Sequence, residues 1–120
     1  MTKRPTNWNK QIKEILEKFS DIHWQKNAFL MKAGLASSPD EMCCWPEDFL
    51  MEEWVRENLT LFPKKLQENF KKFFCQIEVI PEDTSYKSPD AALLADEWIE
   101  MRRLTTEILQ QLEDIPLFQT

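Results

Sequence analysis

The chemically most distinctive residues of this chain are carboxylates gathered between positions 40 and 57, where methionine and tryptophan side chains are interleaved with them. In protein interfaces, apolar anchors provide desolvated contact area, and surrounding charges steer the encounter and reject wrong partners. We therefore expect a surface that binds a basic protein partner. Its candidate residues are Asp40, Glu41, Met42, Trp45, Glu47, Asp48, Met51, Glu52, Glu53 and Glu57.

The apolar residues of this segment admit a second interpretation, in which they fill the protein interior and only the acids face solvent. Leu50 and Trp54 favour it, because they fall on the inward side of the helix expected there. Met42, Trp45 and Met51 lie off the main apolar stripe and near a proline. For these three residues the sequence leaves both interpretations open.

Nucleophilic catalysis has little support. His23 is the only histidine, and it stands between Ile22 and Trp24, where a structural role is expected. Cys43 and Cys44 adjoin the acidic segment, which disfavours the reactive thiolate form. Adjacent cysteines also lack the spacing of a structural zinc site. We therefore expect a non-enzymatic protein without a bound metal.

Two carboxylate pairs keep a metal-dependent hydrolase as a third hypothesis. Glu14 and Glu17, and Glu97 and Glu100, have the Glu-x-x-Glu spacing that helical metal proteins use. Such spacings also arise by chance when 21 of 120 residues are acidic. Gly34 is the only glycine, so neither a phosphate-binding loop nor a dinucleotide fingerprint is present, and no cofactor is expected.

The net charge of −6 argues against general binding to nucleic acid or to an anionic membrane surface. Lysines at positions 64, 65, 71 and 72 form a local basic face, which could instead pair with an acidic helix of the same chain. No apolar run approaches the roughly 18–20 residues that span a bilayer. Three cysteines with an adjacent pair, and a polar start, favour a reducing cytoplasmic location.

Three ladders of apolar residues at alternating steps of four and three predict the fold. Such spacing keeps every member on one side of an α-helix, so each helix must bury a stripe against another. The ladders are Trp8, Ile12, Ile15, Phe19 and Ile22; then Leu66, Phe70, Phe73, Ile77 and Ile80; then Leu94, Trp98, Met101, Thr105, Ile108, Leu112 and Ile115.

We predict one all-α domain over residues 1–120, an antiparallel four-helix bundle with a short extra helix near residue 40. The expected helices are 7–33, 39–44, 46–59, 63–80 and 89–113, followed by an apolar tail at 115–118. A core of the first and third long helices, with the last helix lying across it, is an alternative packing. A short strand at 75–80 is a second alternative, because apolar residues there also alternate.

Start and stop signals define these boundaries. Asn7 is a candidate N-cap, and proline follows serine at Pro39 and at Pro89, a combination that suits the first turn of a helix. Pro63 is placed to open another helix. The Trp45-Pro46 step is expected to break the chain between two helices, because the residue before a proline avoids helical backbone angles.

Together these features predict a non-enzymatic acidic interaction protein. The most specific hypothesis is an immunity or inhibitor protein that neutralises a nuclease-type toxin or another nucleic-acid-handling enzyme. The alternative is a structural or assembly subunit, or adaptor, that docks through its last helix and the tail at 115–118. Self-association as a homo-oligomer stays open.

Overall fold

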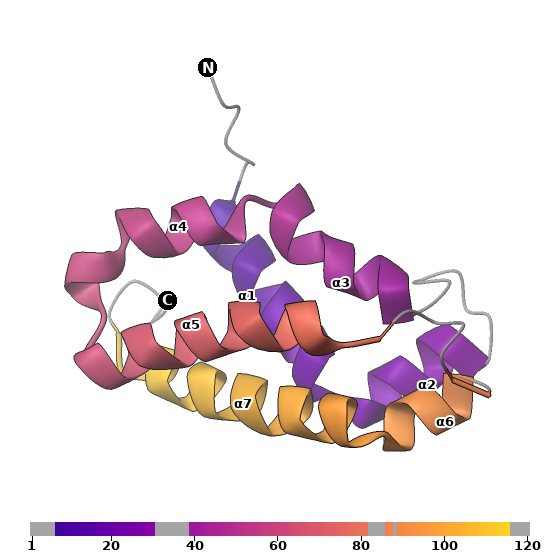
Figure 1. The fold of residues 1–120 in the computed structure, drawn as a ribbon. Coiled ribbons are helices and arrows are strands. Elements are labelled where there is room, and N and C mark those ends of the chain that lie inside the picture. Colours follow the sequence, from indigo (N-terminus) through magenta and orange to yellow (C-terminus); the bar gives the residue numbers. More distant parts are fainter. Residues whose placement is uncertain (1–6, 31–38, 82–85, 88, 116–120) are drawn as a thin grey trace.

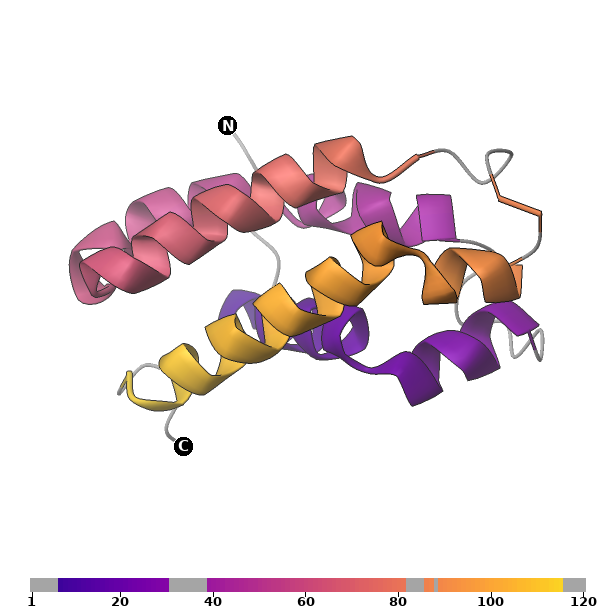
Figure 2. The same ribbon diagram turned by 60° about the horizontal axis from the view of Figure 1, so that its bottom comes forward.

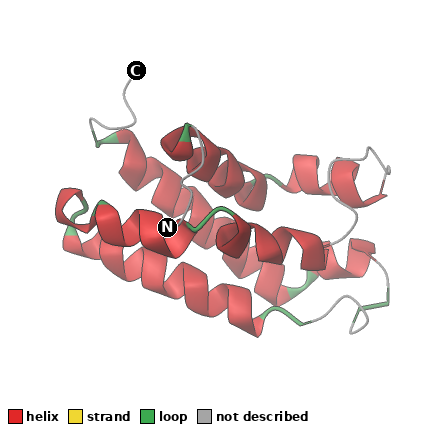
Figure 3. Cartoon of the chain, turned by 90° about the horizontal axis from the view of Figure 1, so that it is seen from above, coloured by secondary structure: helices red, strands yellow, loops and turns green. Residues whose placement is uncertain are grey.

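The computed structural model describes residues 7–30, 39–81, 86–87 and 89–115, and every regular element in these ranges is a helix (Figure 3). The all-α prediction is confirmed. The strand considered at 75–80 is wrong, because the helix there continues to Val79. The elements are α1 (Trp8–Ser20), α2 (Ile22–Leu30), α3 (Pro39–Asp48), α4 (Met51–Glu57), the 3-10 turn η1 (Leu59–Leu61), α5 (Lys64–Val79), α6 (Pro89–Leu94) and α7 (Asp96–Glu113).

Helix α7 is the centre of the packing, because it contacts α1 on one side and α5 on the other. Helices α5 and α7 run in opposite directions, and after the turn at η1 the chain runs back as α5 beneath α4 and α3 (Figure 1). Helices α2 and α6 pack against each other at the far end (Figures 1 and 2). An antiparallel four-helix bundle is compatible with this arrangement.

The core contains most members of the three predicted ladders together with residues of α3, α4 and α6. Phe19 of α1 stacks on Trp98 of α7 at 6.0 Å between ring centroids, and meets Phe73 of α5 edge-on at 5.6 Å. Trp54 of α4 packs on Phe70 of α5 at 6.0 Å. All five rings are buried or nearly so. Offset and edge-on aromatic pairs add roughly 0.5–1.5 kcal/mol each beyond the apolar area that they bury.

The single helix expected at 7–33 is wrong within the described residues, because the chain breaks at Asp21. One carboxylate oxygen of Asp21 accepts hydrogen bonds from the backbone N–H groups of His23 at 2.9 Å and Trp24 at 3.1 Å. This side chain therefore caps the start of α2, and a cap requires an extended backbone that ends α1. Residues 31–33 lie outside the described part of the chain.

The helix expected at 89–113 is also divided, by an extended backbone at Ala95. The break changes which side of the chain faces inward. Leu94, the first member of the third ladder, is 61% exposed, whereas Ala92 and Leu93 are buried. The start at Pro89 and the buried stripe from Trp98 to Ile115 agree with the sequence pattern.

A polar network joins these two unexpected breaks. The side-chain amide of the fully buried Gln25 donates to the carbonyls of Lys18 at 2.9 Å and Phe19 at 3.0 Å, which lie near the C-terminal end of α1. Its oxygen accepts a 2.9 Å bond from Arg102, which also donates to the carbonyl of Leu93. Burial lowers the pKa of Arg102. The guanidinium is thus held at the carbonyl end of α6, which favours positive charge, and Gln25 connects it to the end of α1.

The break expected at Trp45-Pro46 is wrong, because α3 continues through Pro46 to Asp48. Pro46 lies one turn after Met42, and both residues are buried on the same side of the helix. The proline nitrogen cannot donate a helical hydrogen bond, and the burial of both side chains compensates for this loss. Helical bonding resumes with the N–H of Phe49, which donates to the carbonyl of Trp45 at 2.9 Å. The chain instead turns at Leu50.

The network at the two breaks gives a stability prediction. Replacing Arg102 by Ala leaves the buried oxygens of Gln25 and Leu93 without this donor, so we expect the free energy of unfolding to fall by about 2–3 kcal/mol. Arg103→Ala is the matched control. Arg103 pairs only with the surface carboxylates of Glu100 and Glu107, so its removal should lower the free energy of unfolding by less than about 1 kcal/mol. Urea denaturation followed by circular dichroism measures both. Equal losses in the two variants would contradict the role assigned to Arg102.

Candidate interaction surface

A groove of about 440 Å³ lies between the α3–α4 segment and the second half of α5. Its floor is apolar and its rim is mainly acidic. The apolar lining consists of Cys43, Pro46 and Leu50 on one side and of Phe74 and Ile77 on the other. The charged lining consists of Glu47, Glu52, Glu53, Arg56 and Glu78. We call this feature the acidic groove.

The carboxylates of the acidic groove are available for a partner. Within the part of the chain that the structure describes, none of the four forms an ion pair. Four glutamates and one arginine give the lining a net charge of −3. Concave surfaces with charge of one sign concentrate their field and accelerate the encounter with ligands of opposite charge.

Three of the ten predicted partner-binding residues meet in this groove, namely Glu47, Glu52 and Glu53. Glu41, Asp48 and Glu57 are exposed but do not line it. Asp40 belongs to α3, and its side chain lies outside the described part of the structure. The predicted segment therefore contributes one wall of the groove rather than the whole surface.

For Met42 and Met51, where the sequence left both interpretations open, the core interpretation is correct and their place among the partner-binding residues is wrong. Both side chains are fully buried in the hydrophobic core. The reason is the position of the helix break: because α3 runs on to Asp48 and α4 begins at Met51, both methionines face inward toward the packed aromatic residues. Trp54, by contrast, is in the core as the sequence favours.

Trp45 is half-buried and faces α1 and α2 instead of the acidic groove. Its ring meets Trp24 edge-on at 5.8 Å between centroids, and the ammonium of Lys18 lies 5.6 Å from the Trp45 ring centroid. A second cavity of about 290 Å³ lies beside it, lined also by Gln11, Glu14 and Phe49. Trp45 therefore packs α3 against the N-terminal helices. It supports the helix that forms the groove wall but does not line the groove.

Leu50 forms the corner between α3 and α4 with left-handed backbone angles, φ 56° and ψ 42°. A leucine pays about 1–2 kcal/mol for this conformation, which glycine adopts without the steric clash of a Cβ atom. Two indoles hold the corner in place. Trp8 donates to the carbonyl of Phe49 at 2.8 Å, and Trp54 donates to the side-chain oxygen of Asn9 at 2.8 Å. Strained residues tend to cluster at functional sites.

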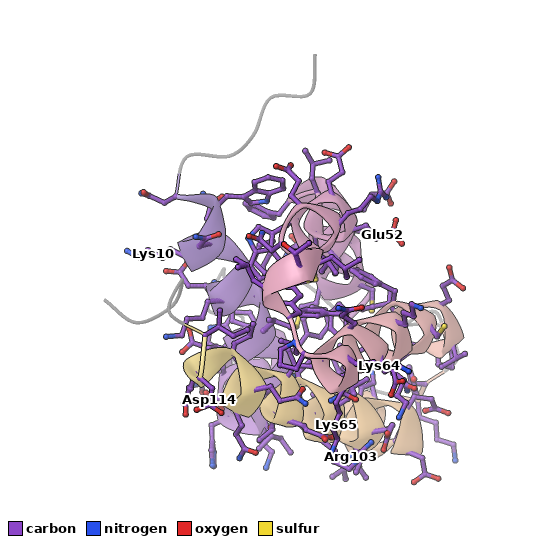
Figure 4. The ribbon with its side chains drawn as sticks, turned by 90° about the vertical axis from the view of Figure 1, so that its left-hand side faces the viewer. Lys10, Glu52, Lys64, Lys65, Arg103 and Asp114 are labelled. Carbon is purple, nitrogen blue, oxygen red and sulfur yellow. The ribbon has the colours of Figure 1, made fainter. Side chains whose placement is uncertain are left out.

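The lysine face of α5 pairs at least partly with α7. The ammonium of Lys65 lies 3.8 Å from a carboxylate oxygen of Glu107. A hydrogen bond from Arg103 lowers the pKa of Glu100, and the charge of Lys72 on α5 acts in the same direction. Figure 4 shows Lys64 and Lys65 on the same side as Arg103, away from Glu52 on α4. The lysines at the start of α5 thus lie beside α7 and its acids rather than beside Glu52.

The other candidate residues are not brought together. Among the described residues, no group of three or more histidine, cysteine or acidic side chains is arranged to hold a metal ion. In the second Glu-x-x-Glu pair the two carboxylates have different partners. Glu100 accepts a hydrogen bond from Arg103, and Glu97 accepts a long 3.5 Å bond from Tyr86. His23 is exposed, and none of the three cysteines, all of which are described, forms a disulfide.

The apolar tail expected at 115–118 is described only at Ile115, which is buried in the core of its own chain. Residues 116–118 lie outside the described range.

None of the described helices combines the length and the apolar character that crossing a membrane requires. The chain shows no significant match to a protein-family model, to a curated protein or to a solved structure.

Sequence reasoning missed the second wall of the groove, formed by Phe74, Ile77 and Glu78 of α5. Ile77 was assigned to the core ladder, and it is half-buried. One signal was present: Phe74 directly follows the ladder residue Phe73, so two adjacent aromatics cannot both face the same neighbour. An apolar residue beside a ladder indicates a second contact surface.

The strained corner gives a prediction about backbone preference. At Leu50 we expect the glycine variant to be more stable than the alanine variant by about 1 kcal/mol, because alanine retains the left-handed penalty. At Glu68, an exposed position inside α5, the order should reverse by a similar amount, because glycine weakens a helix. Chemical denaturation of the four variants measures this comparison. A less stable glycine variant at both positions would show that Leu50 carries no such strain.

Proposed function

We propose that this chain is a non-enzymatic interaction protein whose acidic groove binds a basic protein partner. The observation that carries the proposal is the set of four carboxylates around an apolar floor that form no ion pair with any described residue. The carboxylates raise the rate of encounter with a cationic surface, and the apolar floor provides contact area that excludes water.

In its most specific form, the proposed partner is a nuclease-type toxin or another enzyme that handles nucleic acid. Such enzymes present cationic surfaces to phosphate groups, and an acidic groove is complementary to a surface of that kind. The net charge of −6 supports this form, because it favours long-range attraction to a basic partner. The proposal includes a cytoplasmic location, which the three free cysteines support.

Charge reversal at the groove tests the proposal. We expect the triple variant Glu47→Lys, Glu52→Lys and Glu53→Lys to lose capture of the basic partner from native cell extract, because the rim changes from negative to positive. The captured proteins are identified by mass spectrometry and then bound in purified form by calorimetry. The loss should exceed about a hundredfold in affinity, since close like charges each cost several kcal/mol. Affinity for the wild type should also fall as salt rises.

The matched control reverses three exposed acids outside the groove, Glu17, Glu68 and Asp114. It changes the net charge by the same amount, so it separates local complementarity from general attraction. Because Glu52 and Glu53 lie in the first turn of α4, where the helix dipole favours acids, the unfolding of both variants is measured alongside. A partner that binds both folded variants as tightly as the wild type would refute the groove as its site.

A further inference from the structure

The two walls of the acidic groove present side chains at helical spacing. Cys43, Pro46 and Leu50 follow one another by three and four residues along α3 and its corner, and Phe74 and Ile77 are three apart on α5. Each set therefore forms a ridge along its helix, and the groove is the slot between two such ridges. A third row of side chains with similar spacing would fit into this slot.

The backbone of these walls restricts the form of an occupant. Apart from the corner at Leu50, the groove lining comes from helices. Along α5 and the body of α3 the N–H and C=O groups are used within the helix, and only the first turn of α4 has N–H groups without an intrahelical acceptor. No strand edge is present in the described residues, so the groove cannot extend a sheet. An extended peptide seated here would bury its own backbone groups without partners, which is costly. A helix satisfies its backbone groups internally.

The groove is large enough for the side chains along one face of a helix, but not for a whole helix. From Cys43 to Leu50 the wall spans seven residue steps, or roughly 10 Å at the helical rise of about 1.5 Å per residue, which is about two helical turns. A volume of about 440 Å³ holds a few inserted side chains, while the backbone of the occupant stays outside. The inserted residues would recur at steps of three and four, like the ridges that receive them.

The charges on both walls define the flanks of this occupant. Glu47, Glu52 and Glu53 come from the α3–α4 wall, and Glu78 comes from the α5 wall. Basic residues on both sides of an apolar ridge would therefore each meet a carboxylate. Arg56 is the exception, and it makes the α4 end of the groove less favourable for a cation.

We infer that the segment bound in the acidic groove is an amphipathic basic α-helix of two to three turns, with its apolar ridge between α3 and α5 and with lysine or arginine on both flanks. This inference rests on the proposed function and adds the conformation of the partner. The left-handed corner at Leu50 belongs to the same surface, since Leu50 lies at the end of the α3 ridge.

Two labelled peptides of 14 residues test the inference by fluorescence anisotropy. One is an amphipathic leucine–lysine helix, and the other has the same charge and a proline at its centre. We expect the first peptide to bind the wild-type protein at least about tenfold more tightly than the second, because proline breaks the helix. Its helicity should rise on binding, as seen by circular dichroism. Arg56→Glu should tighten its binding severalfold.

The Glu47, Glu52 and Glu53 reversal should weaken binding of the helical peptide at least about tenfold, whereas the reversal at Glu17, Glu68 and Asp114 should not. Equal affinity of the two peptides, with both lost in the groove variant, would overturn the helical form and leave the basic-partner proposal standing. Peptide binding that the groove reversal and the control reversal weaken alike would overturn both the inference and the proposed function.

Discussion

The fold depends on the polar contact between Gln25 and Arg102, because it holds together the two places where the long helices break. Without the break at Asp21, α2 would continue the line of α1, and without the break at Ala95, α6 would continue the line of α7. The two bends bring α2 and α6 side by side. A buried amide and a partly buried guanidinium are costly unless they are hydrogen-bonded, so their network both stabilises this arrangement and penalises straight alternatives.

A tertiary hydrogen bond also holds the corner between α3 and α4, where the groove wall turns. The Phe49–Leu50 corner is unfavourable by local backbone preference, and it is retained because an indole on α1 binds its carbonyl and Trp54, which follows it in α4, is buried in the core. The core residues thus set the position of the acidic residues. Glu47 lies just before the corner and Glu52 just after it, and the turn between them brings both carboxylates to one groove. Charge provides the chemistry of this surface, and apolar packing provides its shape.

The sequence predicts the helical class and the stripes of α5 and α7 well, because apolar periodicity depends little on tertiary context. The breaks were harder to see. Asp21 does carry a capping side chain, but Ile22 happens to continue the apolar rhythm and hides it. Ala95 has no capping side chain, so its extended backbone depends on tertiary contacts, among them the bond from Arg102 to the carbonyl of Leu93. At the groove, the acids of the α3–α4 segment were recognisable as surface residues. Phe74 and Glu78 could not be placed beside them, since no local pattern says which helix will lie opposite.

The bond from Trp8 to the carbonyl of Phe49 joins residues 41 positions apart in the chain. Helices α3, α4 and α5 follow one another in the chain, whereas the indole that binds their corner comes from α1. Formation of the proposed binding surface therefore depends on the packing of α1 against α3 and α4. A partner that selects the fixed corner would in turn favour the docked position of α1, since a ligand stabilises the state that it binds. Partner capture would then act as a quality check, retaining chains that have folded fully and passing over those in which the N-terminal helix has come loose.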